Sequence, residues 1–556
     1  MQRTVPLLLI LVAAMSVLFL GLATVAIASP LAPPLVPQAP MILPATTAST
    51  ASGSGSGSSH WILGAPPVDS TAKIANRMGA QPVGGESTGI YRVPAAKATR
   101  FARKLQSTVG LSYAEPDVKA IPAGYPSDLF WNEESWLNRI VNTTDVTPPP
   151  AAAGSPTLGL IEQAIDPNHP DLQQANLTHV KSVSAAADSH GTAIAAIAGS
   201  PGEGLGIRGV WPGMAMRQFP SGLSCSSTTA AVIKAAKAKV SVINMSYGFA
   251  GDTCYSHYLA TELAVQKGVV PVASAGNTYL EGNAPMRPAT DPHVISVSAV
   301  DPGNDVAPFA TRNDKVDLTA PGVDVYAPTV STSGGTAAGT KTDYGWAPLS
   351  GTSYSAPMVA AAATWLRQAR PYLDGSQVSR LLGETALDLG AAGKDDDYGN
   401  GLLNIGSSLV VDTPPGDALE PNDDISWING SILPKKAKFV WKGGLAKKKS
   451  VTATLNRDKD PADVYQVKIP PKAQILITAA QFEGDVRLDV LKPSAKTIVN
   501  PGKKLIVRSD RPAPKTEGVR VKNLKKKAQT IYVSVTTSPR YSYQYDFYRL
   551  SVRPSK

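Results

Sequence analysis

Short apolar runs alternate with helical patterns through the middle of this 556-residue chain. Runs rich in Val, Ile and Ala predict buried strands, and apolar residues that recur every three or four positions predict helices. Strands that are separated by helices are typical of a parallel sheet covered on both faces, with functional groups at the carboxyl ends of the strands. The predicted strands are 157–161, 240–245, 269–273 and 294–300, and the predicted helices are 228–238, 257–266, 354–368 and 377–385.

The pattern changes on either side of this region. Between residues 60 and 120, a helical stretch at 95–106 lies between short apolar segments at 90–93 and 111–113, which predicts a small α+β module. Beyond Pro414 and Pro415 the apolar runs become strand-sized and are separated by turns rich in Pro, Gly, Asp and Lys, which favours an antiparallel β-sandwich. These runs are 464–467, 475–478, 486–491 and 531–535.

The first residues predict export. An apolar run over 5–28 follows Arg3 and ends in Ala26-Ile27-Ala28, which is typical of a secretory signal peptide that is cleaved after Ala28. An uncleaved membrane anchor is the alternative, because the run is long enough to cross a bilayer. In both cases the rest of the chain is exported, so we expect a secreted or cell-surface protein in an oxidising compartment.

Composition completes the division into domains. Residues 29–59 are rich in Pro and Ala and then in Ser and Gly, which predicts a disordered linker between the signal peptide of 1–28 and the module of 60–120. The central domain then spans 121–411, and the sandwich spans 412–556. Hydrophobic residues make up 43% of the chain and charged residues 17%, as in globular proteins.

The charge is concentrated in one domain, and the cysteine content excludes two kinds of site. The net charge of +10 comes from the last domain, because residues 417–556 hold 28 Lys and Arg against 13 Asp and Glu. The chain has two cysteines, Cys225 and Cys254, which excludes a disulfide-dense scaffold and a four-thiolate zinc site.

Four short strings carry residues suited to chemistry. His190 begins a helix of small residues, and Ser353 lies at a helix start, where free backbone N–H groups and the helix dipole stabilise developing negative charge. Asn277 follows an apolar strand and carries an amide that can donate a hydrogen bond to an oxyanion. The string 242–248 ends another strand in small residues that an extended peptide can pair with. Each string is weak alone, since His-Gly-Thr is more often a turn or a helix cap.

Together and in this order, the strings resemble those of the subtilisin-like serine proteases (subtilases), over roughly residues 120–410. The resemblance implies a parallel α/β sheet and a Ser/His/acid triad that needs no cofactor, with protein or peptide substrates. It assigns Ser353 as the nucleophile, His190 as the general base and later acid, and Asn277 with the Ser353 N–H as the oxyanion hole. The substrate-binding residues it implies are Ser246, Tyr247, Gly248, Ser274, Ala275 and Gly276.

The acid of the triad departs from the family pattern. Subtilases have Asp-Thr/Ser-Gly seven residues before a His-Pro-Asp-Leu string, and here His169 begins that string while Glu162-Gln163-Ala164 precedes it. The resemblance therefore assigns Glu162, which is one methylene longer than Asp, to orient His190. Asp166 is an alternative acid in the following loop. The alternative for the whole site is an impaired relative that binds peptides or cell-surface polymers without cleaving them.

The module of 60–120 resembles a subtilase propeptide, which assists folding and then inhibits the enzyme until it is removed. Its end at 113–117 matches the close of such a domain, so we expect autoprocessing within 118–125. A permanently attached N-terminal domain is the alternative.

Two further features depend on the resemblance. In the family geometry, the segments that carry Cys225 and Cys254 both begin helices on the substrate side of the sheet, which implies a disulfide; unpaired buried thiols are the alternative. Asp171 and Glu203 match positions near a calcium site in some subtilases, so calcium is a candidate structural ion.

The last domain resembles the pre-peptidase C-terminal domain of secreted proteases, through its strings at 419–423 and 460–465. Its positive charge would attract anionic polymers of a cell envelope, or serve only for solubility. Lysine runs without interleaved aromatic residues argue against nucleic-acid binding. We expect a monomer.

Overall fold

The computed structural model describes residues 60–83, 86–111, 113–116, 135–141, 148–179, 189–202, 206–251, 253–333, 341–417, 419–430, 448–540 and 544–555. The expected signal peptide, the linker and the expected autoprocessing segment lie outside these residues. The chain divides into two compact units, 1–123 and 124–556. Among the described residues, no helix combines the length and the apolar character that a membrane span requires.

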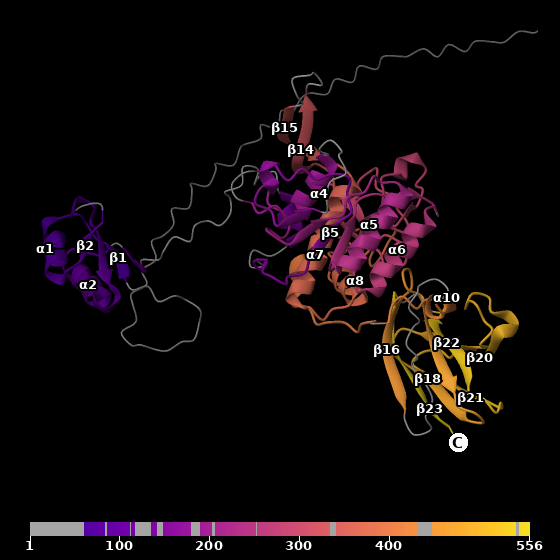
Figure 1. The fold of residues 1–556 in the computed structure, drawn as a ribbon. Helices are drawn as coiled ribbons and strands as arrows, with labels where there is room; N and C mark the ends of the chain where they lie inside the picture. The colour runs from indigo at the N-terminus through magenta and orange to yellow at the C-terminus, as the bar shows by residue number, and fades with distance from the viewer. Residues whose placement is uncertain are drawn as a thin grey trace, which may run out of the picture. The chain divides into compact units, whose positions relative to one another are not determined.

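The first unit is a four-stranded sheet with two helices (Figure 1). The order of its strands is β2-β3-β1-β4, and β1 pairs antiparallel with both β3 and β4. Helix α2 forms because Ala98, Phe101, Ala102 and Leu105 recur every three or four residues and make one buried face. The elements are β1 (His60–Gly64), α1 (Asp69–Met78), β2 (Gln81–Pro82), η1 (Glu86–Thr88), β3 (Ile90–Pro94), α2 (Ala95–Thr108) and β4 (Tyr113–Pro116).

A seven-stranded sheet forms the centre of the second unit, in the order β13-β12-β10-β8-β5-β7-β6. All its neighbouring strands are parallel. The predicted strands are therefore confirmed, with ends that differ by one or two residues. The strands are β5 (Leu158–Leu160), β6 (Leu177–His179), β7 (Met216–Gln218), β8 (Val242–Met245), β10 (Val270–Ser274), β12 (Ile295–Val300) and β13 (Leu318–Pro321).

Helices cover both faces of this sheet, so the expected α/β fold with a parallel sheet is confirmed. Helix α4 (Ser189–Gly199) and the long α7 (Thr352–Ala369) pack into one hydrophobic core, whereas α5 (Cys225–Ala238) and α6 (Tyr255–Gln266) pack into a separate one. Figure 1 shows α5 and α6 side by side. Shorter helices complete the layers: α3 (Ser135–Val141), η2 (Pro170–Leu172), η3 (Tyr279–Glu281), α8 (Gly375–Glu384) and α9 (Ile405–Val410).

Two small antiparallel pairs were not predicted from the sequence. Strands β14 (Val325–Ser333) and β15 (Lys341–Leu349) form a hairpin, and β9 (Phe249–Ala250) pairs with β11 (Met286–Arg287). The hairpin is joined to the start of α4, because Oγ of Ser189 donates to the Val330 carbonyl and accepts from the Val330 N–H. The second pair brings segments that follow β8 and β10 together.

The last part of the chain is the expected antiparallel sandwich, with sheets of order β16-β23-β18-β21 and β17-β22-β19-β20. Alternating apolar residues of both sheets fill one core. The sandwich contacts the α/β domain at two points. Glu483 of the sandwich lies 2.8 Å from Arg380 of the α/β domain, and Lys459 of the sandwich donates to the Ala289 carbonyl. The elements are α10 (Ile425–Ile428), β16 (Lys449–Asn456), β17 (Ala462–Ile469), β18 (Gln474–Glu483), β19 (Val486–Leu491), η4 (Gly502–Lys504), β20 (Leu505–Ser509), β21 (Glu517–Lys522), β22 (Gln529–Thr537) and β23 (Tyr545–Pro554).

Candidate active site

Three neighbouring strands of the parallel sheet end in the polar residues that the sequence singled out. Glu162 follows β5, Ser246 follows β8, and Asn277 follows β10. Because β10, β8 and β5 are adjacent and parallel, their carboxyl ends meet at the same edge of the sheet. This edge therefore collects the candidate site from segments far apart in the sequence.

His190 and Glu162 are in direct contact. Nδ1 of His190, on the first turn of α4, lies 3.0 Å from Oε2 of Glu162. The Glu162 side chain is 1% exposed and that of His190 is 30% exposed, so the carboxylate is buried behind a ring that solvent and substrate can reach. Gly191 permits this approach, because a Cβ there would lie 2.1 Å from the backbone oxygen of Ala164.

The alternative acid, Asp166, is engaged elsewhere. Its Oδ1 accepts from the Asn168 N–H, and its Oδ2 accepts from the Tyr344 hydroxyl of the β14–β15 hairpin. Glu162 is thus the acid that the fold places against His190.

Ser353 lies at the start of α7, as its second residue. Two hydrogen bonds tie it to the end of β8: Oγ of Ser246 donates to the Ser353 carbonyl at 2.8 Å, and Oγ of Ser353 donates to the Ser246 carbonyl at 3.3 Å. The ring of the next residue, Tyr354, lies 5.9 Å from the ring of His190. Ser353 lies in the first turn of α7, where the helix dipole favours negative charge nearby.

Asn277 is oriented by the residue that precedes Ser353. Its Oδ1 accepts from the backbone N–H of Thr352 at 3.0 Å and from the Thr352 hydroxyl at 2.9 Å. The side of the amide that carries hydrogens is thereby directed away from Thr352, and Asn277 is exposed. The residues expected to form the oxyanion hole are thus joined through Thr352, whose part in the site the sequence analysis missed.

The expected substrate-binding residues form two neighbouring segments, 246–248 after β8 and 274–276 at the end of β10. A hydrogen bond holds the side chain of Tyr247, because its hydroxyl lies 2.8 Å from Nε2 of His257. Burial and the nearby Glu162 charge raise the pKa of Tyr247 well above its usual value, so the hydroxyl donates this bond. Burial and Arg287 lower the pKa of His257 to about 4, so its ring is neutral and accepts.

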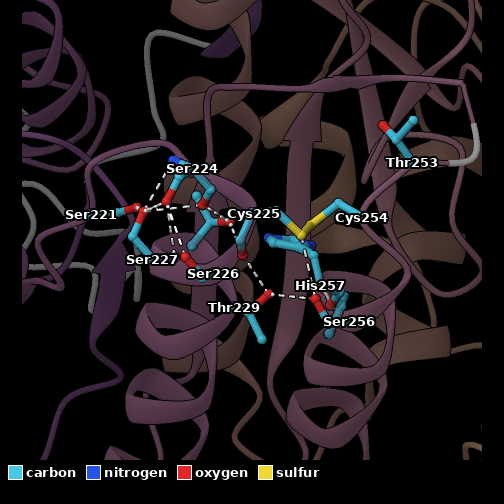
Figure 2. The surroundings of a disulfide bond; sticks show 12 residues. Ser221, Ser224, Cys225, Ser226, Ser227, Thr229, Thr253, Cys254, Ser256 and His257 are labelled. Atoms are coloured by element: carbon cyan, nitrogen blue, oxygen red, sulfur yellow. Dashed lines mark hydrogen bonds between the residues drawn. A yellow bond between two sulfur atoms is a disulfide. The ribbon is translucent and has the colours of Figure 1, made fainter.

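Cys225 and Cys254 are joined by a disulfide in the structure (Figure 2). Cys225 is the first residue of α5, and Cys254 immediately precedes α6. Ser224 and Ser227 cap the start of α5 through a reciprocal pair of hydrogen bonds. The disulfide therefore joins the starts of two adjacent helices.

The structure offers little to a metal at the expected calcium position. Asp171 is 1% exposed, and its two carboxylate oxygens accept from the Ile207 N–H and from Nε1 of Trp346. Glu203 lies outside the described residues. Asp171 therefore serves to hold the β14–β15 hairpin and the 206–207 turn, which is a structural role.

A denser group of carboxylates lies where the sandwich meets the α/β domain. Potential ligand atoms of His293, Glu420, Asp423 and Asp460 lie within 4.8 Å of one another, and so do those of Asp417, Glu420 and Asp463. Asn422 is 2% exposed, and its amide oxygen has no hydrogen-bond partner among the described residues. We call this group the junction cluster; it consists of Asp417, Glu420, Asn422, Asp423, Asp460 and Asp463.

The junction cluster concentrates negative charge in a buried place. Burial, together with the neighbouring carboxylates of Glu262 and Asp463, raises the pKa of Asp423 to about 7, and burial raises that of Asp463 to about 6. One cation faces it from the α/β domain, because Nε2 of His293 lies 3.1 Å from Glu420. Nδ1 of the same ring lies 3.0 Å from Oε2 of Glu262. Buried carboxylates in excess of cations, with an unpaired amide oxygen, suit a hard divalent ion such as calcium. The sequence analysis noted both strings but assigned them no metal.

Comparisons with known proteins relate this chain to one family. A model of the subtilase family matches residues 154–401. Subtilisin DY of Bacillus licheniformis is 31% identical over 259 residues, which are 45% of this chain and 88% of that protein. The minor extracellular protease Epr of Bacillus subtilis is 29% identical over 298 residues, which are 52% of this chain and 43% of Epr. The crystal structure of fervidolysin from Fervidobacterium pennivorans matches with 18% identity and a TM-score of 0.45, over 86% of this chain and 92% of that one. This chain belongs to the subtilase family of serine peptidases.

Proposed function

We propose that this chain is a secreted serine endopeptidase that hydrolyses peptide bonds in proteins, with Ser353, His190 and Glu162 as its triad. The contact of 3.0 Å between Glu162 and Nδ1 of His190 carries the proposal, because the triad acid is the position at which this chain departs from the family pattern. Two further hydrogen bonds support the arrangement. Asn277 accepts from the Thr352 N–H, and the Ser353 carbonyl accepts from the Ser246 hydroxyl.

Acylation begins when Oγ of Ser353 attacks the carbonyl carbon of the scissile bond. Nε2 of His190 takes the hydroxyl proton, and Glu162 accepts from Nδ1–H, which selects the productive tautomer and stabilises the imidazolium. Asn277 and the Ser353 N–H donate to the oxyanion that forms; such a donor is worth about 10² to 10³ in turnover.

The intermediate then collapses. His190 gives its proton to the nitrogen of the leaving amine, the C–N bond breaks, and Ser353 is left as an ester of the acyl half. A water molecule attacks this ester with His190 again as the base, and release of the acid restores the serine.

Glu162 suits this work because it is buried. At 1% exposed, its charge acts on the imidazolium with little screening by solvent. The extra methylene relative to Asp is accommodated within a normal hydrogen-bond distance, so the longer arm is matched to this strand end.

The first unit is proposed to act as the propeptide. Its described part, from β1 to β4, is a separate small domain with its own core. The same proposal includes secretion directed by the 1–28 segment and removal of the 60–120 segment. The anionic cell-envelope partner of the basic domain stays a prediction from its charge.

The fate of the recombinant chain tests the proposal. The wild-type protein should shed its N-terminal unit and label with a fluorophosphonate serine probe, whereas Ser353→Ala should stay full length and unlabelled. If both migrate alike and neither labels, the chain is a non-catalytic relative, which then binds peptides without cutting them. A peptide-binding measurement on Ser353→Ala distinguishes that second function.

We also propose that calcium is a structural ion at the junction cluster. Its five carboxylates offer oxygens, the ligand type that calcium prefers, and the buried amide oxygen of Asn422 has no hydrogen-bond partner among the described residues. The ion would neutralise charge that burial makes costly and would stabilise the contact between the sandwich and the α/β domain.

A further inference from the structure

Met286 lies between the two segments that line the substrate. A Cβ placed on Gly248 would lie 2.8 Å from Cε of Met286, and one placed on Gly276 would lie 2.5 Å from Cγ of Met286. The methionine side chain therefore spans the gap between the 246–248 and 274–276 segments and packs against both glycine backbones. Both contacts leave room only for hydrogen on the glycines.

The backbone on either side of Met286 fixes this position. Met286 pairs with Ala250 in the β9–β11 ladder, and the Gly251 N–H donates to the Pro285 carbonyl. The Met286 carbonyl in turn accepts from the Thr290 N–H at 3.1 Å. Ladder and turn hold the Cα, so the side chain cannot leave the gap by a shift of the main chain.

The gap is the place where one substrate side chain must go. In the proposed mechanism the scissile carbonyl oxygen faces Asn277, which directly follows Gly276. The residue that bears this carbonyl then has its Cα beside Gly276, and its side chain points between the two segments. Met286 lies beneath that point, so it limits the depth of the pocket.

The side chains nearest to Gly276 in this gap are uncharged. The side chains that meet Gly276 there are Met286 and Thr311, and the Thr311 hydroxyl is already paired with Thr278 at 2.9 Å. The neighbouring Arg287 is turned away and lies 2.6 Å from Asp291. A charged substrate side chain would lose water in this gap without gaining an ionic partner.

From these contacts we infer that Met286 determines specificity: the enzyme cleaves after small uncharged residues such as Ala, Ser and Gly, and excludes Phe, Leu and Lys at that position. The inference rests on the proposed function and names its substrate class. One methylene in an apolar pocket changes discrimination about 10- to 200-fold, so a blocked floor should exclude a Phe ring by at least tenfold.

The test is a series of peptide p-nitroanilides that differ only in the residue before the cleaved bond. Wild type should show a kcat/KM for Ala at least about tenfold above that for Phe, Leu or Lys. Met286→Gly, and in smaller measure Met286→Ala, should raise the Phe-to-Ala and Leu-to-Ala ratios about tenfold or more, because each opens the floor. Met286→Ala also serves if the glycine variant does not fold. Leu280→Ala is the control, since this side chain is 73% exposed on the same connection and should leave the ratios unchanged.

The outcomes separate this inference from the proposed function. A protein that labels with the fluorophosphonate probe and cleaves after Phe as fast as after Ala overturns the inference alone. Equal ratios in wild type and both Met286 variants also overturn it. A protein that does not label overturns the proposed function, and the inference with it.

Discussion

The carboxylate of Glu162 lies 3.0 Å from Nδ1 of His190, although it reaches the ring through one methylene more than the aspartate that subtilases use. The β5 strand ends two residues before Glu162, and Gly191 allows the start of α4 to approach the chain at Ala164. The carboxylate and the ring thus meet because the strand end and the helix start are placed for the longer side chain.

Removing the charge of Glu162 should therefore disable the enzyme. Glu162→Gln should lower kcat by about 10⁴, the loss that accompanies a wrong imidazole tautomer. Glu162→Asp should also lower kcat, by about 10², because its carboxylate falls short of Nδ1 and small misplacements are costly. Both values come from kcat measured on one peptide substrate.

Asp166→Asn is the matched control for this pair of variants. Its carboxylate accepts from Asn168 and Tyr344, so kcat should stay close to that of wild type. A gain in kcat for Glu162→Asp would show that the native acid is poorly placed. A loss in Asp166→Asn as large as that in Glu162→Gln would move the triad role to Asp166.

The disulfide should contribute substantially to stability. It closes a loop between residues separated by 29 positions, which corresponds to about 3 to 4 kcal/mol in the chain-entropy model. The Cys225→Ser/Cys254→Ser double variant should lose about that much free energy of unfolding in urea, and a reductant should destabilise only the wild type. Equal stability of wild type with and without reductant would contradict this.

Acid should weaken the fold through His257. Its folded pKa is lowered to about 4 by burial and by Arg287, while an unfolded histidine titrates near 6.5. Between these values the unfolded chain binds more protons, so stability falls as pH falls, by about 2 kcal/mol from pH 7 to pH 5. His257→Gln should reduce that pH-dependent loss by the same amount.

The measurement is the free energy of unfolding in urea at the two pH values. The readout is the difference between pH 7 and pH 5, which a general packing loss in His257→Gln would not imitate. An unchanged difference would mean that His257 is not neutral in the fold.

The edge of the sheet that carries the candidate site could be predicted from the sequence, because its strands are fully buried. Runs such as 242–245 and 270–274 are mostly apolar and are buried at every position, as in a strand that is covered on both faces. The ends of these runs then place Asn277 and Ser246 together. Glu162 was predicted only from the family resemblance, because the hydrophobic pattern of the chain does not distinguish it from other residues.

Other features depend on contacts that no local pattern records. The β14–β15 hairpin is polar and interrupted by Pro328, Gly345 and Pro348, so its pairing is decided by Ser189, Asp166 and Asp171 across the fold. Met286 lies in no motif, and its place becomes apparent only when two distant glycines pack against it. The junction cluster joins strings about 40 residues apart in the sequence.

Calcium should stabilise this protein through the junction cluster. Chelation with EGTA should lower the thermal midpoint of wild type, and added calcium should restore it, because a ligand at 100 times its Kd stabilises by about 2.7 kcal/mol. Asp460→Asn and Asp463→Asn should abolish the response, since each removes a negative oxygen from the cluster. Asp171→Asn is the matched control: its carboxylate serves Ile207 and Trp346, so this variant should be less stable yet keep the full calcium response. If the response is lost in Asp171→Asn and kept in the two cluster variants, the ion binds at the position expected from the resemblance.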